Sequence, residues 1–136
     1  MKTALMLLGA LLIAAPATTA LADDYPDGCV SCHANEGGVD LRLNTLLARI
    51  GHGRGGERTK EIPVGCNRCH VSDGSGVAPP TRTIVHTLHY RNPDQNVFTT
   101  QYGGDCLHCH SMDGASGKAA IKVGERNWSL SVAGSD

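Results

Sequence analysis

The chain has 136 residues, a length typical of one domain. Its 12 basic and 13 acidic residues give a formal net charge of −1, which excludes the strong basic excess of a nucleic-acid-binding protein. It contains one Phe, one Trp and three Tyr, a small supply of large side chains for a hydrophobic core.

The segment 1–22 has the three parts of a secretory signal peptide. Lys2 gives a positive start, an apolar run extends from Ala4 to Ala15, and Ala20-Leu21-Ala22 is a small-x-small cleavage site before Asp23. The apolar run is shorter than the stretch of about 20 residues that spans a bilayer, and no later segment qualifies, so no membrane span is expected after cleavage. The sequence therefore predicts a periplasmic protein, with extracellular release or surface display left open.

Three Cys-x-x-Cys-His motifs use every cysteine in the chain. They are Cys29–His33, Cys66–His70 and Cys106–His110. Two thiols at this spacing add to the vinyl groups of a porphyrin as thioethers, and the adjacent histidine binds the iron as its proximal ligand. The motifs predict three haem c groups, attached at Cys29, Cys32, Cys66, Cys69, Cys106 and Cys109 and bound through iron by His33, His70 and His110.

Zinc binding and disulfide bonds are the competing uses of these cysteines. Tetrahedral zinc sites can be built from Cys-x-x-Cys pairs, but each site needs four ligands, so three pairs cannot be divided evenly among such sites. Zinc also does not require a histidine directly after every second cysteine. Six cysteines in a small exported chain could form disulfides, although Cys-x-x-Cys pairs usually mark redox or ligand chemistry. The pattern favours haem over both.

Haem would also account for the composition of the expected mature domain, residues 23–136. This domain has 114 residues (136 − 22) and, without Lys2, a formal charge of −2 (11 − 13). Three porphyrins would supply the apolar bulk that its few aromatic residues cannot, and ligation would organise the polypeptide as structural metals do. We therefore expect a mainly α chain with much irregular loop, folded as one trihaem domain around a haem-organised core.

Few regular elements are expected between the motifs. Asp40 could cap a helix from Leu41 to about Gly51, in which leucine and isoleucine recur on one face. The glycines after this segment would end the helix. Residues 53–62 are rich in glycine and charge and are predicted to form a solvent loop, as are residues 73–80, which end in a Pro-Pro break.

A second helix is predicted from Thr81 to Tyr90. His86 and His89 lie three residues apart in this segment and therefore on one side of the helix. After the last motif, residues 119–123 could form a short strand or irregular cover, and both alternatives stay open.

The sixth ligand of each iron decides its chemistry. Two protein ligands make a low-spin electron carrier, whereas an open position admits a small molecule. Met112 lies too near His110 to reach the far face of that haem easily, and His108, inside the third motif, is expected to have a surface or supporting role. The remaining free histidines are His52, His86 and His89. Three ligands for three irons predict bis-histidine ligation, with His86 and His89 serving two neighbouring haems and all six pairings open.

The three motifs in a short exported chain, with free histidines between them, resemble the class III, low-potential multihaem cytochromes c. Residues 84–93 (IVHTLHYRNP) followed by residues 102–106 (YGGDC) also resemble small cytochromes, or cytochrome subunits, that serve periplasmic flavoprotein reductases of the fumarate reductase kind. The resemblance implies an electron-delivery role for residues 29–110. Many of these relatives carry four haems, and the count of three here is a departure.

The sequence therefore predicts an electron-transfer protein and not an enzyme. It would accept electrons from a membrane quinol-oxidising cytochrome and pass them to a terminal reductase, with a flavoprotein as one candidate acceptor. Bis-histidine ligation predicts low reduction potentials, which suit anaerobic respiration. Two alternatives stay open, a small reductase with one open haem and a subunit of a surface filament in which haems stack between subunits. The oligomeric state is not predicted.

Overall fold

The computed structural model describes residues 23–130. Its helices are α1 (Cys29–Cys32), α2 (Leu43–Arg49), α3 (Gly53–Arg58), α4 (Thr81–Tyr90) and α5 (Val97–Gln101), with 3-10 turns η1 (Val64–Arg68) and η2 (Cys106–His108). Its strands are β1 (Asn35–Glu36), β2 (Val39–Asp40), β3 (Glu61–Ile62), β4 (His110–Met112), β5 (Ala119–Ile121) and β6 (Gly124–Glu125). Over this range, no helix has both the length and the apolar character needed to cross a membrane. The predicted signal peptide, residues 1–22, lies outside the described residues.

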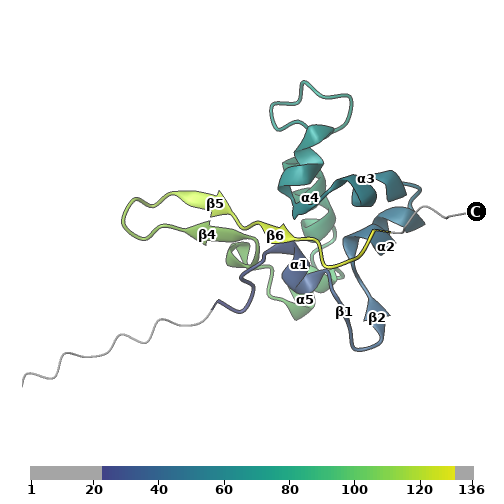
Figure 1. Cartoon of the computed structure of the whole chain (residues 1–136). Helices are drawn as coiled ribbons and strands as arrows, with labels where there is room; N and C mark the ends of the chain where they lie inside the picture. Colours follow the sequence, from purple (N-terminus) through teal and green to yellow (C-terminus); the bar gives the residue numbers. More distant parts are fainter. Residues whose placement is uncertain (1–22, 131–136) are drawn as a thin grey trace, which may run out of the picture.

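The strands form three small antiparallel sheets, β1 with β2, β3 with β6, and β4 with β5. The β4–β5 hairpin extends away from the helices, as Figure 1 shows. The segment from residue 119 to 123 is therefore a strand at its start, because Ala119 pairs with Met112 and Ile121 with His110. The β3–β6 pair is a long-range connection that joins the middle of the chain to its last described part.

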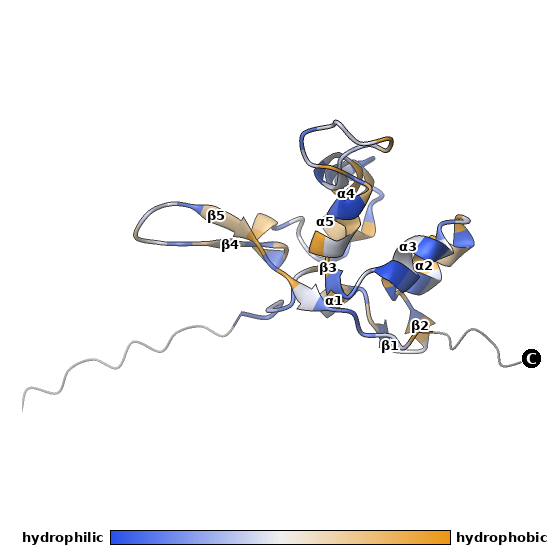
Figure 2. Cartoon of the chain, turned by 45° about the horizontal axis from the view of Figure 1, so that its top comes forward, coloured by the Kyte–Doolittle hydropathy of each residue, from blue (hydrophilic) through white to orange (hydrophobic). Residues whose placement is uncertain are grey.

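Very little of the described part of the chain is buried. Among residues 23–130, the buried hydrophobic side chains are Val30, Ile62 and Trp128. The helices α2, α4 and α5 contain no buried residue. Figure 2 shows apolar residues spread over separate elements, including β5 and the loop that precedes α4, and not gathered in one centre. A soluble domain normally covers the apolar face of an amphipathic helix, so the uncovered apolar faces of α2, α4 and α5 indicate surfaces that another group covers.

The first predicted helix begins later than expected. It starts at Leu43 and not Leu41, because Asp40 lies in β2 and pairs there with Asn35. The expectation that Asp40 caps this helix is wrong. Its carboxylate instead accepts hydrogen bonds from the backbone and guanidinium of Arg42 and from the Thr45 hydroxyl, at 2.8–3.1 Å. These bonds hold the entry to α2, and they keep the pKa of Asp40 far below its ordinary value.

The predicted solvent loop at residues 53–62 is also wrong, since its first half is helix α3. This helix packs against α2 through Gly56, where a Cβ would lie only 3.0 Å from the Cα of Asn44. The close approach needs a residue without a side chain. Glycine disfavours isolated helices, so α3 depends on this packing and not on local propensity.

The second predicted helix is confirmed as α4, with the bounds expected from the sequence. Asn96 determines how the chain continues after it. Its side-chain amide donates to the carbonyl of Leu88 at 2.8 Å, and its side-chain oxygen accepts from the backbone N–H of Phe98, which caps α5. The helix α5, which was not expected from the sequence, is thereby held beside α4. Residues 73–80 have no helix or strand, as expected.

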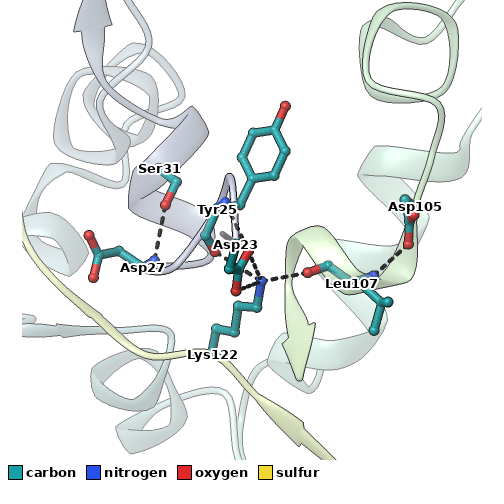
Figure 3. Close-up of polar contacts among 7 residues, drawn as sticks. All are labelled: Asp23, Tyr25, Asp27, Ser31, Asp105, Leu107 and Lys122. Atoms are coloured by element: carbon teal, nitrogen blue, oxygen red, sulfur yellow. Dashed lines mark hydrogen bonds and ion pairs between the residues drawn. The ribbon is translucent and has the colours of Figure 1, made fainter. Parts of the chain in front are cut away.

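The last described segment ties distant parts of the chain together. Figure 3 shows the Lys122 ammonium, on a side chain that is 7% exposed, donating to the Asp23 carboxylate and to the carbonyls of Tyr25 and Leu107. The amide of Asn127 donates to the carbonyls of Val30 and His33. Residues 122–127 therefore form a strap across the first and third motifs.

Candidate functional site

Each Cys-x-x-Cys-His motif forms one tight helical turn. In the first two motifs the backbone N–H of the histidine donates to the carbonyl of the first cysteine, at 2.8 Å for His33 and 3.0 Å for His70. In the third, the backbone N–H of the second cysteine donates to the carbonyl of the first, at 3.2 Å. One turn of this kind places residues i and i+3 on the same face, so both thiols of a motif can reach one edge of a porphyrin. All six thiols are free.

Every motif histidine lies next to one of the three free histidines. The pairs are His33 with His89 at 6.0 Å between ring centres, His70 with His52 at 5.9 Å, and His110 with His86 at 6.1 Å. We call these pairs the first, second and third site. All six histidines that the sequence predicts as iron ligands are thus brought together, two by two, although the members of each pair lie far apart in the sequence.

The spacing of the rings fits a metal ion between them. A metal–imidazole bond is about 2.0 Å long and the ring centre lies about 1.2 Å behind the bonding nitrogen, so two imidazoles on opposite sides of one metal have centres about 6.4 Å apart. The three measured separations, 5.9, 6.0 and 6.1 Å, are slightly shorter than this value. If two such histidines bound one iron, a porphyrin would supply the four remaining donor atoms.

Backbone carbonyls set the orientation of three of these rings. The Nδ1–H of His33 donates to the carbonyl of Leu41 at 3.0 Å, and that of His70 to the carbonyl of Pro79 at 2.7 Å. The Nδ1–H of His89 donates to the carbonyl of Val85, one helical turn earlier, at 2.9 Å. A carbonyl can only accept, so Nδ1 carries the proton and Nε2 keeps its lone pair. This is the usual arrangement of a metal-binding histidine.

The electrostatics favour neutral groups at the first motif. Burial raises the pKa of the Cys29 thiol to about 11, and the neighbouring thiols of Cys109 and Cys66 contribute to this rise. Burial likewise lowers the pKa of His33, with a smaller effect from His89, which favours the neutral imidazole that a metal requires. Redox-active Cys-x-x-Cys motifs have lowered thiol pKa values, so the first motif does not resemble one.

Glycine at position 55 leaves space in front of the His52 ring of the second site. A Cβ on Gly55 would lie 2.8 Å from the Nε2 of His52. A side chain there would occupy the approach to the nitrogen that a metal needs. This residue was not predicted from the sequence, although three glycines within the six residues of helix α3 are a signal, because each is disfavoured there without a packing reason.

Three residues near the sites have other surroundings. His108 is not paired with another histidine, and its ring lies against Tyr25 at 4.1 Å and Phe98 at 5.9 Å between ring centres. Met112 is 63% exposed on strand β4. Phe98, which was not predicted from the sequence, also lies 5.1 Å from the ring of His89 and so backs the distal position of the first site.

Within residues 23–130, no three His, Cys, Asp or Glu side chains gather as a site for a bare metal ion, and the histidines meet in pairs instead. Comparison with protein-family models, with curated proteins and with solved structures finds no match to this chain.

Proposed function

We propose that this protein is a trihaem cytochrome c that transfers electrons in the periplasm. The observation that carries the proposal is that each of the three motif histidines lies next to a different free histidine, with 5.9–6.1 Å between ring centres. Chance placement of seven histidines would not give three separate pairs, each with one proximal and one distal candidate. The haems would be attached through the two cysteines of each motif.

The geometry also favours one of the six ligand pairings left open by the sequence. His89 serves the first motif, His52 the second and His86 the third. Since His86 and His89 lie on successive turns of α4, this helix supplies the distal ligands of two haems and holds them next to each other. The connections cross in sequence, because the first motif takes its ligand from beyond the second.

Haem would cover the apolar surface that the polypeptide leaves open. Leu88 on α4 is 60% exposed and Val97 on the neighbouring α5 is 53% exposed. Three porphyrins provide large flat apolar faces for such side chains. This supports a core made mainly by cofactor, with the Val30, Ile62 and Trp128 cluster as its polypeptide part.

The proposed mechanism depends on two histidine ligands for each haem iron. Haem bound as proposed would supply a one-electron couple, and the two histidines of each site would hold its iron in both oxidation states. The carbonyls that accept from Nδ1 of His33, His70 and His89 keep these rings in place, so little rearrangement accompanies a change of charge. With two histidines on each iron, a substrate would have no open position to bind, and the protein would act as a carrier and not as an enzyme.

The partners we propose are redox proteins, with a membrane quinol-oxidising cytochrome as donor and a flavoprotein reductase as candidate acceptor. One docking position is suggested by a hollow beside the second motif, lined by the cations Arg58, Lys60 and Arg68 and by one acid, Glu61. An acidic partner surface would be steered there, and its association rate would fall as salt rises.

The proposal is tested by haem stoichiometry and electron paramagnetic resonance (EPR) of the oxidised protein. Three covalent haems, all low-spin, are expected. His52→Ala, His86→Ala and His89→Ala should each convert one third of the iron to high-spin. His108→Ala is the matched control, because this histidine is not paired with another, and it should leave all iron low-spin. A high-spin signal in the native protein, or from the control alone, would reject the ligand assignment and favour a reductase with an open haem.

A further inference from the structure

The attachment sites of the first and second motifs share one cluster. Cys29 and Cys66 both pack against the buried side chains of Val30, Ile62 and Trp128. In the second motif Cys66 is the partly buried cysteine, whereas Cys69 is exposed. The shared cluster therefore brings Cys66 near Cys29.

The third motif reaches the same place from the other side, through Lys122. The backbone N–H of Lys122 donates to the carbonyl of Cys109 at 2.9 Å, and its ammonium donates to the carbonyl of Leu107. Lys122 also lies against Gly28, where a Cβ would be 2.9 Å from the Cβ of Lys122. This one residue of the strap therefore bridges Cys109 and the immediate neighbour of Cys29.

The two cysteines of the third motif also differ in exposure. Cys109 is partly buried and Cys106 is exposed. Cys109 is also the cysteine that Lys122 connects to Gly28, the neighbour of Cys29. In the second and third motifs alike, therefore, the more buried cysteine is the one that lies toward Cys29.

The shape of haem c determines how three haems would lie if Cys66 and Cys109 are both near Cys29. Its two thioether bonds lie on one edge of the macrocycle, and its two propionates lie on the opposite edge. We infer that the three haems meet at their thioether edges around Cys29, with their propionates directed outward, and that the first haem is the relay between the second and the third. The inference rests on the proposed function and adds an order of transfer to it.

Each transfer in this arrangement is a one-electron step. The iron of the donating haem goes from Fe(II) to Fe(III), and the iron of the accepting haem goes from Fe(III) to Fe(II). Both irons keep their two histidines, so no bond is made or broken and no further reactant is required. An electron that enters at the second haem would reach the third through the first, and the reverse path is equally open.

Nuclear Overhauser effects (NOEs) in the fully reduced, diamagnetic holoprotein test this arrangement directly. Cross-peaks are expected between the thioether substituents of the first haem and those of both others, and none from any propionate to another haem. Trp128 is the single tryptophan of the chain, so its indole signals are unambiguous. Packed with Cys29 and Cys66, it should show cross-peaks to the first and second haems. Because the indole packs with Cys29 and Cys66, its signals should also be shifted by the ring currents of the porphyrins attached there.

The outcomes separate this inference from the proposed function. Haem content and spin state are measured on the same sample, and their failure would reject the cytochrome itself. With three low-spin haems present, cross-peaks between the second and third haems but none to the first, or contacts through propionates, would overturn the relay. Trp128→Phe should remove the indole cross-peaks and keep those between haems. If that variant does not assemble, the cross-peaks of the native protein still decide the matter.

Discussion

If the protein carries three haems as proposed, replacing Gly55 with alanine should disturb one of them and no other. The added Cβ would lie 2.8 Å from the Nε2 of His52, whereas ordinary contact begins at 3.4 Å. The ring must therefore move by about 0.6 Å, which exceeds the tolerance of about 0.2 Å on a metal–ligand bond. We expect His52 to leave the iron of the second site, so that one iron of three becomes high-spin.

Gly53→Ala is the matched control. It makes the same change in the same helix, but its Cβ would lie 3.9 Å from Ala48, in ordinary contact. Neither glycine has a positive φ, so alanine is sterically allowed by the backbone at both. Each substitution should favour α3 by about 0.5–1 kcal/mol through helix propensity. Gly53→Ala should therefore raise the free energy of unfolding while all iron stays low-spin.

EPR of the oxidised variants, with the high-spin signal integrated against total haem, measures the difference. A value near one third is expected for Gly55→Ala and a value near zero for Gly53→Ala. If Gly55→Ala keeps three low-spin haems, then His52 is not a ligand or its ring has room that the structure does not give it. A high-spin signal from both variants would mean that α3 itself, and not the position of one ring, controls ligation.

Three further results are expected. The two rings of the first site are nearly perpendicular, at 88°, whereas those of the third site are 35° apart. Perpendicular imidazoles cancel the splitting between the iron dxz and dyz orbitals, so the first site should give the more anisotropic low-spin EPR signal. Equal anisotropy at both sites would contradict these ring planes. Lys122→Met leaves two carbonyl acceptors without their donor and should lower the free energy of unfolding by about 2–4 kcal/mol in denaturant titrations, whereas Lys118→Met in the β4–β5 hairpin should have little effect. The hydrogen bond from the Lys122 ammonium lowers the pKa of Asp23 below its ordinary 3.8, so the stability that this pair adds should be complete above pH 3.8 and be lost as the pH falls below it. If Asp23→Asn leaves the acid side of the stability–pH curve unchanged, the pairing is wrong.

Local features are largely predictable from the sequence. The motifs specify their own turns, because the spacing of two cysteines and a histidine within one pentapeptide is a short-range property. Helix α4 is predictable with its bounds, since Pro80 precedes it and a helical pattern continues from Thr81 to Tyr90. The choice of His52, His86 and His89 as candidate ligands comes from counting the free histidines, and all three do lie next to a motif histidine.

Features that depend on packing are not predictable in this way. The glycines of α3 argue against a helix locally, and only the close approach of Gly56 to α2 makes them favourable. Asp40 has the chemistry of a helix cap, but its place in a two-residue strand moves the helix start to Leu43. In both cases a contact with another element outweighs a local preference.

The amino-acid sequence alone identifies the candidate donor groups, namely three Cys-x-x-Cys-His motifs and three further histidines that match them in number. The tertiary structure decided the partner of each histidine, and it brought His89 past the second motif to His33 in the first. It also decided that the strap at residues 122–127 joins the first and third motifs. The physical reason is that ligand type is a property of single side chains, whereas pairing requires the chain to close long loops, and which loops close depends on the packing of the whole molecule.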